Sequence, residues 1–167
     1  PGTKATYHHI YFPAMKNVET EVHHSPAFLY TPYRNRRLQQ WFLENSEEQF
    51  RNVVNTQYGE IIMPTREFNM VFQLCHIYKH LFEEGVGLRQ LMDYYYVLKT
   101  TPINIEKQQD ALMIIRRSGM LNFAKAVMWV MQEVFGLEKE FQYVEPDEKV
   151  GRLLLEEIEA TGNFGQM

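Results

Sequence analysis

The sequence predicts an α+β fold that is predominantly α, in which a short N-terminal β-hairpin precedes a bundle of five or six helices. Two observations support this prediction. Residues 5–12 are mostly β-branched and aromatic and residues 18–24 alternate along the chain, which is typical of strands. The rest of the chain carries apolar residues at helical spacing, in segments bounded by proline and glycine. Strands that precede helices, rather than alternating with them, are typical of α+β domains.

Two short segments predict the hairpin. Residues 5–12 (ATYHHIYF) are rich in strand-forming types, and residues 18–24 (VETEVHH) alternate along the chain. Because successive side chains of a strand point to opposite faces, Glu19, Glu21 and His23 are expected on one face of the second strand. A lone hairpin is only marginally stable in water, so we expect it to belong to a larger sheet that this chain hardly supplies.

Helices are expected from Thr31 onward. Pro32 suits the first turn of a helix, whereas residues 49–60 follow no clear pattern and are expected to be irregular or extended. Thr65 and Asn104 are expected to cap two of the later helices. The remaining predicted helices span residues 65–84, 88–99, 104–118, 120–135 and 147–160.

Composition indicates one ordinary globular domain without a strong charge bias. The 167 residues carry a net charge of −4, so no overall basic field favours nucleic acid, although the run from Arg34 to Arg37 is a local exception. The single cysteine, Cys75, excludes an intramolecular disulfide and a cysteine-based zinc site, which suits a reducing cytoplasm. No apolar run approaches the roughly 20 residues that span a bilayer. We therefore expect a cytoplasmic protein with neither membrane nor nucleic acid as a partner.

Four titratable side chains are concentrated between residues 76 and 93. His76 and His80 lie four residues apart on the narrow polar stripe of an otherwise apolar helix, so this stripe faces either solvent or a cleft. Arg89 and Asp93, also four apart, follow on the next helix. They form a surface ion pair, or Arg89 faces a phosphate-bearing ligand and Asp93 orients either Arg89 or a neighbouring histidine. No glutamate follows His76 and no third ligand is indicated, which disfavours a zinc site.

The carboxylates of the second strand form another candidate site. Glu19 and Glu21 could hold Mg²⁺, which usually takes one or two carboxylates together with substrate phosphates, or they could belong to a solvated strand face. Cys75 falls on the apolar side of its helix and is expected to be an inert core residue. The three tyrosines at 94–96 are expected to contribute mainly to packing. The chain has no Walker A loop and no Gly-x-Ser-x-Gly motif.

Several motifs together resemble a known family. They are HHI in the first strand, VETEVHHSPAFL, NRRLQQWF and HIYKHLFEEGVGLRQLMDYYYVL, which extend from about Tyr7 to about Phe135. The most specific are E-V-H at 21–23 and H-x-x-x-H followed by G-L-R-x-L-x-D. In these features the chain resembles the uncharacterised bacterial nucleotidyltransferases of the polymerase-β-like superfamily.

The resemblance implies a fold and a set of roles. Such enzymes carry a small mixed sheet in which a Gly-Asp-x-Asp motif and a third carboxylate on a later strand bind Mg²⁺ and a nucleoside triphosphate, and a helical C-terminal domain covers the site. Residues 1–30 would then be a remnant of that sheet, and residues 31–167 the helical domain. Glu21 matches the third carboxylate, as catalytic residue and metal ligand, with Glu19 as the fallback; His23 would help to shape the site. His76, His80, Arg89 and Asp93 match polar helical positions of the family, which makes them the candidate cofactor-binding residues, and the resemblance gives none of them a specific role.

The chain departs from the family pattern in one respect. No Gly-Asp-x-Asp motif is present, and the only aspartates are Asp93, Asp110 and Asp147. A two-metal site needs more than one carboxylate. We therefore expect the C-terminal portion of an Mg²⁺-dependent enzyme that transfers a nucleoside monophosphate from an NTP to an unknown hydroxyl acceptor. This portion alone would be inactive and would bind no cofactor tightly.

Two alternatives remain open. The first is a non-catalytic helical interaction module, whose aromatic surface and exposed hairpin edge would contact a partner or a second copy of the chain. The second is a metal-dependent hydrolase built on His76 and His80. We rank it below the other two because the spacing indicates no third ligand.

Overall fold

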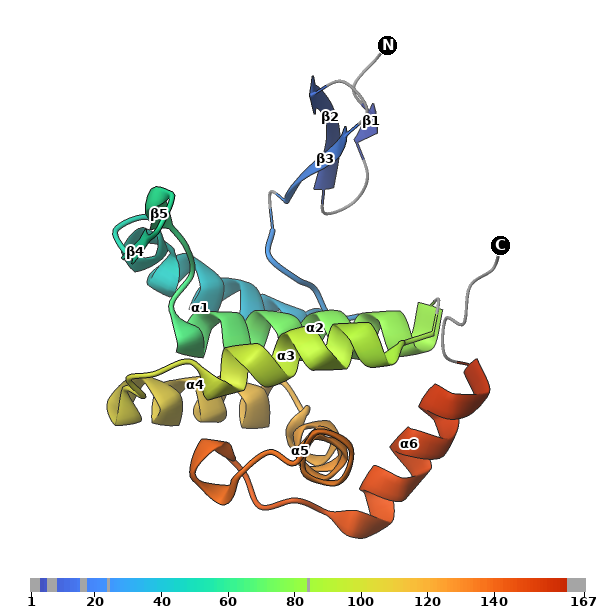
Figure 1. Cartoon of the computed structure of the whole chain (residues 1–167). Helices are drawn as coiled ribbons and strands as arrows, with labels where there is room; N and C mark the ends of the chain where they lie inside the picture. The colour runs from blue at the N-terminus through green and yellow to red at the C-terminus, as the bar shows by residue number, and fades with distance from the viewer. Residues whose placement is uncertain (1–3, 6–8, 16–17, 24, 84, 162–167) are drawn as a thin grey trace.

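A computed structural model describes residues 4–5, 9–15, 18–23, 25–83 and 85–161, and the side chains of residues 25–83 and 85–160. These residues form six α-helices and two small antiparallel sheets (Figure 1). The first sheet precedes every helix along the chain. The predicted fold class, α+β and mainly α, is therefore confirmed.

The N-terminal sheet has three strands in the order β1 (Lys4–Ala5), β2 (His9–Met15) and β3 (Val18–His23). The predicted hairpin is the β2–β3 pair, and the two-residue β1 adds an antiparallel strand to the other edge of β2. Strand β2 extends past the predicted end at residue 12 and includes Pro13. The pairing register shifts there, between Phe12 and Met15, which is where proline cannot donate a ladder hydrogen bond.

Helix α1 (Pro32–Gln49) begins as predicted, with Thr31 before it and proline in its first turn. It buries Trp41, whose indole stacks on Phe68 of α2 with ring centroids 5.7 Å apart. The stretch without a clear pattern forms a second hairpin, β4 (Val53–Thr56) and β5 (Gly59–Ile62), and every residue in these two strands is exposed.

Five further helices follow, and their ends agree with the prediction to within a residue or two. Asn104 caps one of them as predicted, because its Oδ1 accepts a hydrogen bond from the Lys107 backbone N–H at 3.1 Å. Gly136 ends another in the left-handed conformation, with φ of 66°. These helices are α2 (Arg66–Glu83), α3 (Leu88–Lys99), α4 (Ile105–Arg117), α5 (Leu121–Phe135) and α6 (Glu148–Thr161), with a short 3₁₀ turn at Lys139–Phe141.

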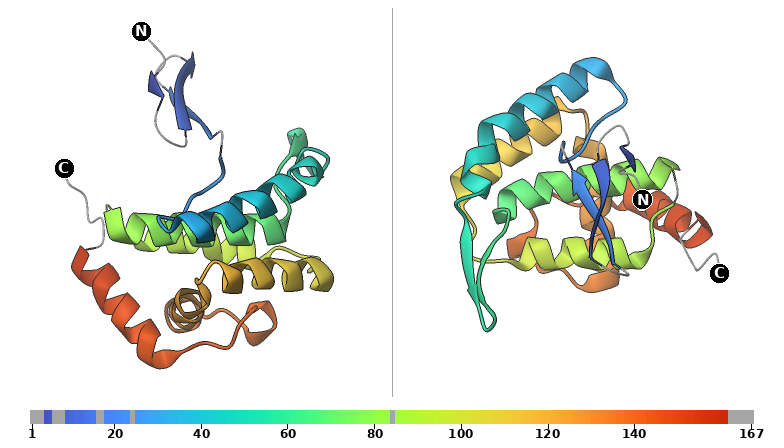
Figure 2. Two further views of the ribbon diagram at one scale, coloured as in Figure 1. Left: turned by 180° about the vertical axis from the view of Figure 1, so that it is seen from behind. Right: turned by 90° about the horizontal axis from the view of Figure 1, so that it is seen from above.

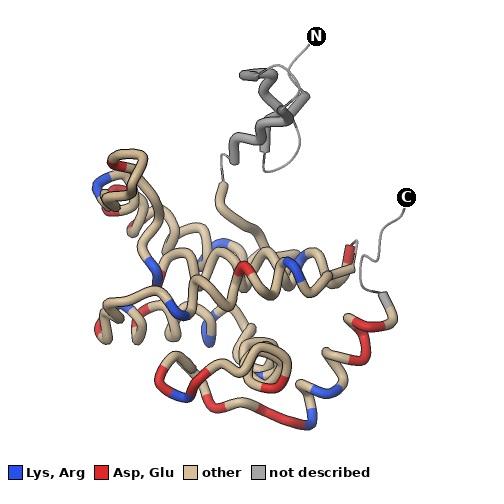
Figure 3. The backbone as a smooth tube through the Cα atoms, in the orientation of Figure 1, with Lys and Arg blue, Asp and Glu red and all other residues tan. Residues whose placement is uncertain are grey.

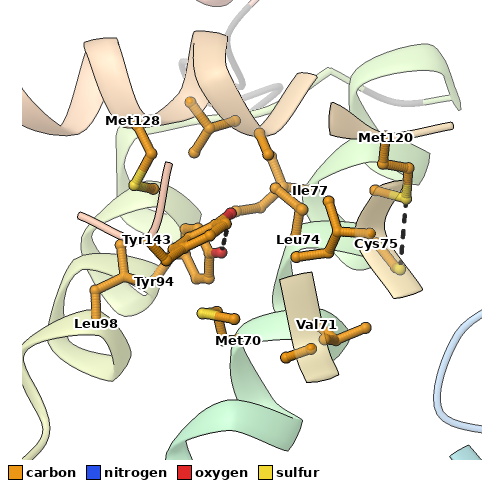
Figure 4. Packing of buried hydrophobic residues seen from close by; sticks show 14 of the residues in the cluster. Met70, Val71, Leu74, Cys75, Ile77, Tyr94, Leu98, Met120, Met128 and Tyr143 are labelled. Atoms are coloured by element: carbon orange, nitrogen blue, oxygen red, sulfur yellow. Dashed lines mark hydrogen bonds between the residues drawn. The ribbon is translucent and has the colours of Figure 1, made fainter. Parts of the chain in front are cut away.

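Helix α2 lies at the centre of the helical core. Its apolar face meets side chains of α3, α5 and the segment after α5 (Figure 4). Two buried tyrosines, Tyr94 of α3 and Tyr143, satisfy each other through a hydroxyl–hydroxyl hydrogen bond of 2.9 Å. Burial raises the pKa of both phenols above their usual range, so both stay protonated at neutral pH. None of the helices in the described part of the chain combines the length and apolar character that crossing a bilayer requires.

Helix α6 packs on α5 through a glycine. A Cβ atom added at Gly151 would lie 2.5 Å from the ring of Trp129 and 2.6 Å from its Cβ, which cannot move without the α5 backbone. We predict that Gly151→Ala separates the two helices and lowers the free energy of unfolding by about 1–2 kcal/mol, since the clash outweighs the better helix propensity of alanine. Urea denaturation monitored by circular dichroism measures this, and an unchanged or higher midpoint would contradict the packing described.

Candidate functional site

The segment between the N-terminal sheet and α1 is anchored to α1 by side-chain amides. The Nε2 of Gln39 donates to the carbonyl of Ala27 at 2.6 Å. The Oδ1 of Asn35 accepts from the backbone N–H of Leu29 at 2.9 Å. One backbone carbonyl and one backbone N–H of this segment are thus paired with side chains of α1, which fixes its path beside that helix.

The same segment contacts the C-terminal half of α2. The ammonium of Lys79 lies 5.2 Å from the centroid of the Phe28 ring, and the hydroxyl of Tyr30 donates to the Glu83 carboxylate. The sheet stands beyond this face in Figure 1 and overlies α2 and α3 in the right-hand view of Figure 2. The segment that follows β3 therefore contacts the end of α2 before the chain enters α1.

His76 and His80 lie side by side on this part of α2. Their ring centroids are 4.2 Å apart in an edge-to-face arrangement, and Phe72 stacks on His76 at 5.8 Å. Both imidazoles are half-buried. Positions three and four apart share a helix face, so the two histidines lie on the face that also presents Lys79 to the connecting segment. This half-buried polar face is next to the segment that leaves β3.

Arg89 and Asp93 lie on α3, which runs back along α2 after the turn at residues 85–87. The start of α3 is thus close to the end of α2 that carries His80 (Figure 1). Both side chains are exposed. No ion pair joins them in the described part of the chain, so the guanidinium of Arg89 is accessible to an anionic ligand.

The metal-binding potential differs between the two candidate sets. Among the residues described with side chains, no three His, Cys, Asp or Glu residues come together to hold a metal ion, so His76 and His80 gain no third ligand there. On β3, Glu21 pairs with Tyr11 of β2, and Glu19 falls on the same face by strand alternation. The structure does not describe the side chains of Glu19 and Glu21. Carboxylate oxygens fit Mg²⁺, which takes one or two protein carboxylates plus phosphates.

A buried ion pair at the start of α2 was not predicted from the sequence. Arg66 and Glu67 form an ion pair at 3.3 Å, with side chains only 2% and 7% exposed. In sequence they look like an ordinary charged first turn after the Thr65 cap. The pair links the start of α2 to the end of α3 and the start of α4, so it supports the fold rather than a ligand site.

Cys75 is the inert core residue that its helical position predicts. Its thiol is buried, 3.7 Å from the sulfur of Met120, and burial raises its pKa to about 12. The thiolate is therefore absent at neutral pH. We predict that a thiol reagent such as 5,5′-dithiobis(2-nitrobenzoate) leaves the native protein unlabelled at pH 8 and labels one thiol in denaturant. Rapid labelling of the folded protein would contradict this.

The strand that carries Glu19 and Glu21 thus precedes a helical domain in which α2 carries two half-buried histidines and α3 carries an exposed arginine. A family model described as uncharacterised nucleotidyltransferase matches residues 1–136 of the 167. The chain belongs to this family. This confirms the family that the motifs of the sequence indicated. Searches of curated proteins and of solved structures returned no match.

Proposed function

We propose that this chain is the C-terminal portion of an Mg²⁺-dependent nucleotidyltransferase, which transfers a nucleoside monophosphate from an NTP to a hydroxyl acceptor. The supporting observation is the family match over residues 1–136, which includes both the E-V-H strand and the polar face of α2 and α3. Residues 1–30 would contribute to the catalytic sheet, and residues 31–167 would form the helical wall of the nucleotide site.

Each candidate residue has a role in this proposal. Glu21 on β3 would hold the metal, with Glu19 as the fallback, because both offer hard carboxylate oxygens on one strand face. Mg²⁺ would neutralise charge on the triphosphate and on the leaving pyrophosphate. Arg89 would bind phosphate through its guanidinium fork. Asp93, one turn further along α3, forms no ion pair with Arg89 among the side chains that the structure describes, and would orient it, or a neighbouring histidine, once phosphate is bound. His76 and His80 would line the nucleotide side of α2 as hydrogen-bonding groups.

The remaining carboxylates would have to come from residues other than these 167. The chain contains no Gly-Asp-x-Asp motif, and a two-metal site needs more ligands than Glu19 and Glu21 provide. We therefore propose that the chain alone is inactive. The coding sequence upstream of Pro1 tests this: it should encode a strand followed by Gly-Asp-x-Asp. A reading frame without this motif would refute the proposal.

A second candidate function is supported by the β4–β5 hairpin. Val53, Val54, Tyr58, Ile61 and Ile62 are large apolar residues, and all are exposed. An apolar groove of about 630 Å³ adjoins Ile62, lined mainly by side chains from α1 and from residues 62–64. Such a surface is typical of an interaction module. Light scattering after size exclusion tests it: a dimer that Ile62→Lys converts to a monomer would support the module, and a wild-type monomer at high concentration would oppose self-association.

A further inference from the structure

A groove of about 1030 Å³ lies between α1 and α4, away from the polar face of α2. Two contacts set the register of these helices. The indole Nε1 of Trp41 donates to Asp110 at 2.6 Å, and the guanidinium of Arg34 packs directly on Gly119, where any Cβ would collide with it. The two helices therefore run antiparallel, and the start of α1 lies beside the end of α4.

This register brings together two basic segments that are far apart in sequence and that carry five arginines between them. None of these arginines forms an ion pair with an acidic group in the described part of the chain. Three of them line the groove, which also contains two acidic residues, Glu44 and Asp110, and the carboxylate of Asp110 accepts a hydrogen bond from Trp41. The five arginines are Arg34, Arg36 and Arg37 of α1 and Arg116 and Arg117 of α4.

The net charge of the chain conceals this cluster. Acidic residues prevail along α6 and the segment before it, at the bottom of Figure 3. The arginine cluster, in contrast, lies on α1 and α4. Net charge is a statement about the whole surface, and binding of an anion depends on the local field. The expectation that nucleic acid is no partner rested on the net charge and on the run from Arg34 to Arg37 considered by itself. It did not include Arg116 and Arg117, which this register places beside that run.

The types of side chain in the groove indicate the kind of anion. All the basic groups are arginines, whose planar fork binds a phosphate through two hydrogen bonds. Tyr33, on the first turn of α1, is 58% exposed and also lines the groove. The guanidinium of Arg37 lies 4.2 Å from the centroid of its ring. An exposed aromatic ring beside phosphate-binding arginines is the combination on which single-stranded nucleic acids stack.

We propose that the α1–α4 groove binds single-stranded nucleic acid, with phosphates on Arg36, Arg37 and Arg117 and a base on Tyr33. This inference goes beyond the proposed function, because binding here requires neither Mg²⁺ nor nucleotidyl transfer. Its failure would therefore leave the proposed function untouched.

Fluorescence anisotropy of a labelled oligouridylate of about 10 nucleotides, a length within the range of single-strand binding sites, tests the inference. Each arginine that neutralises a phosphate of a single strand contributes about 0.7 to the slope of log affinity against log salt. Arg36→Gln/Arg117→Gln should reduce this slope by about 1.4 and weaken binding about tenfold or more at low salt.

Arg51→Gln/Arg152→Gln is the matched control. It removes two exposed arginines that pair with Glu47 and Glu148 outside the groove, and should leave the affinity unchanged apart from a small uniform effect. Tyr33→Ala should also weaken binding, whereas Tyr33→Phe should not, since stacking needs only the ring. Equal losses in the two double variants, or no binding at low salt, would overturn the inference. Equally tight binding of inorganic polyphosphate, unaffected by Tyr33→Ala, would overturn the assignment to nucleic acid.

Discussion

Replacement of Arg66 by alanine is expected to lower the free energy of unfolding by about 3–5 kcal/mol, the range found when one partner of a buried ion pair is removed. The guanidinium donates from Nε and Nη2 to the carbonyl of Leu98, at 3.1 and 3.0 Å, and from Nη1 to Oε1 of Gln108 at 2.9 Å. Alanine would leave that carbonyl without these donors and the neighbouring Glu67 carboxylate buried without its cation.

The loss should affect three helices together. Glu67 also accepts a hydrogen bond from the backbone N–H of Asn104 at 3.2 Å, so the pair links the start of α2 to the end of α3 and the start of α4. Arg152→Ala is the control, because its ion pair with Glu148 is exposed and should contribute less than about 1 kcal/mol. Urea denaturation of both variants gives the comparison. Equal, small losses would show that the buried pair does not stabilise the fold.

Replacement of Glu21 by glutamine in the protein translated from the complete reading frame is expected to reduce nucleotidyl transfer at least about 100-fold. Glutamine keeps the size of the side chain and removes the negative charge that a metal ligand needs, so transition-state stabilisation through Mg²⁺ is lost. Transfer of label from an α-³²P-labelled NTP measures the rate. The variant should fold like the wild type, because the change is isosteric.

Glu19→Gln is the matched control on the same strand face. If Glu21 is the ligand, Glu19→Gln should retain the rate to within about tenfold, the smaller effect of a changed outer-shell charge. A loss confined to Glu19→Gln would assign the ligand to the fallback position. Full activity in both variants would contradict a metal-binding role for β3.

Helices were the most predictable part of this fold because local signals mark their ends. Pro32 begins α1, Asn104 caps α4 and Gly136 ends α5 in the left-handed conformation, and each acts within one turn of its own position. The placement of His76 and His80 on one side of α2 was also predictable, since the two residues are one helical turn apart. These features need no information from distant parts of the chain.

Features that depend on distant contacts could not be predicted. The β4–β5 hairpin buries neither face, so Val53 and Val54 lack the alternation that identifies a strand. Arg66 looks like a solvated helix start because its partners, Leu98 and Gln108, are more than 30 residues away. In the candidate site, strand alternation predicted that Glu19 and Glu21 share a face. The contacts of the segment between β3 and α1 with α2, through Phe28 and Tyr30, follow no pattern in the sequence and could not be predicted.

Calorimetric titration of the protein from the complete reading frame with each NTP, in Mg²⁺ and in excess EDTA, tests the central claim most directly. We predict that at least one NTP binds in Mg²⁺, that EDTA abolishes this binding, and that Glu21→Gln abolishes it as well. Arg89→Gln should weaken it without removing its dependence on Mg²⁺. Binding that is equal in Mg²⁺, in EDTA and in Glu21→Gln, or no binding of any NTP, would contradict the claim that β3 and the α2–α3 face form one metal–nucleotide site.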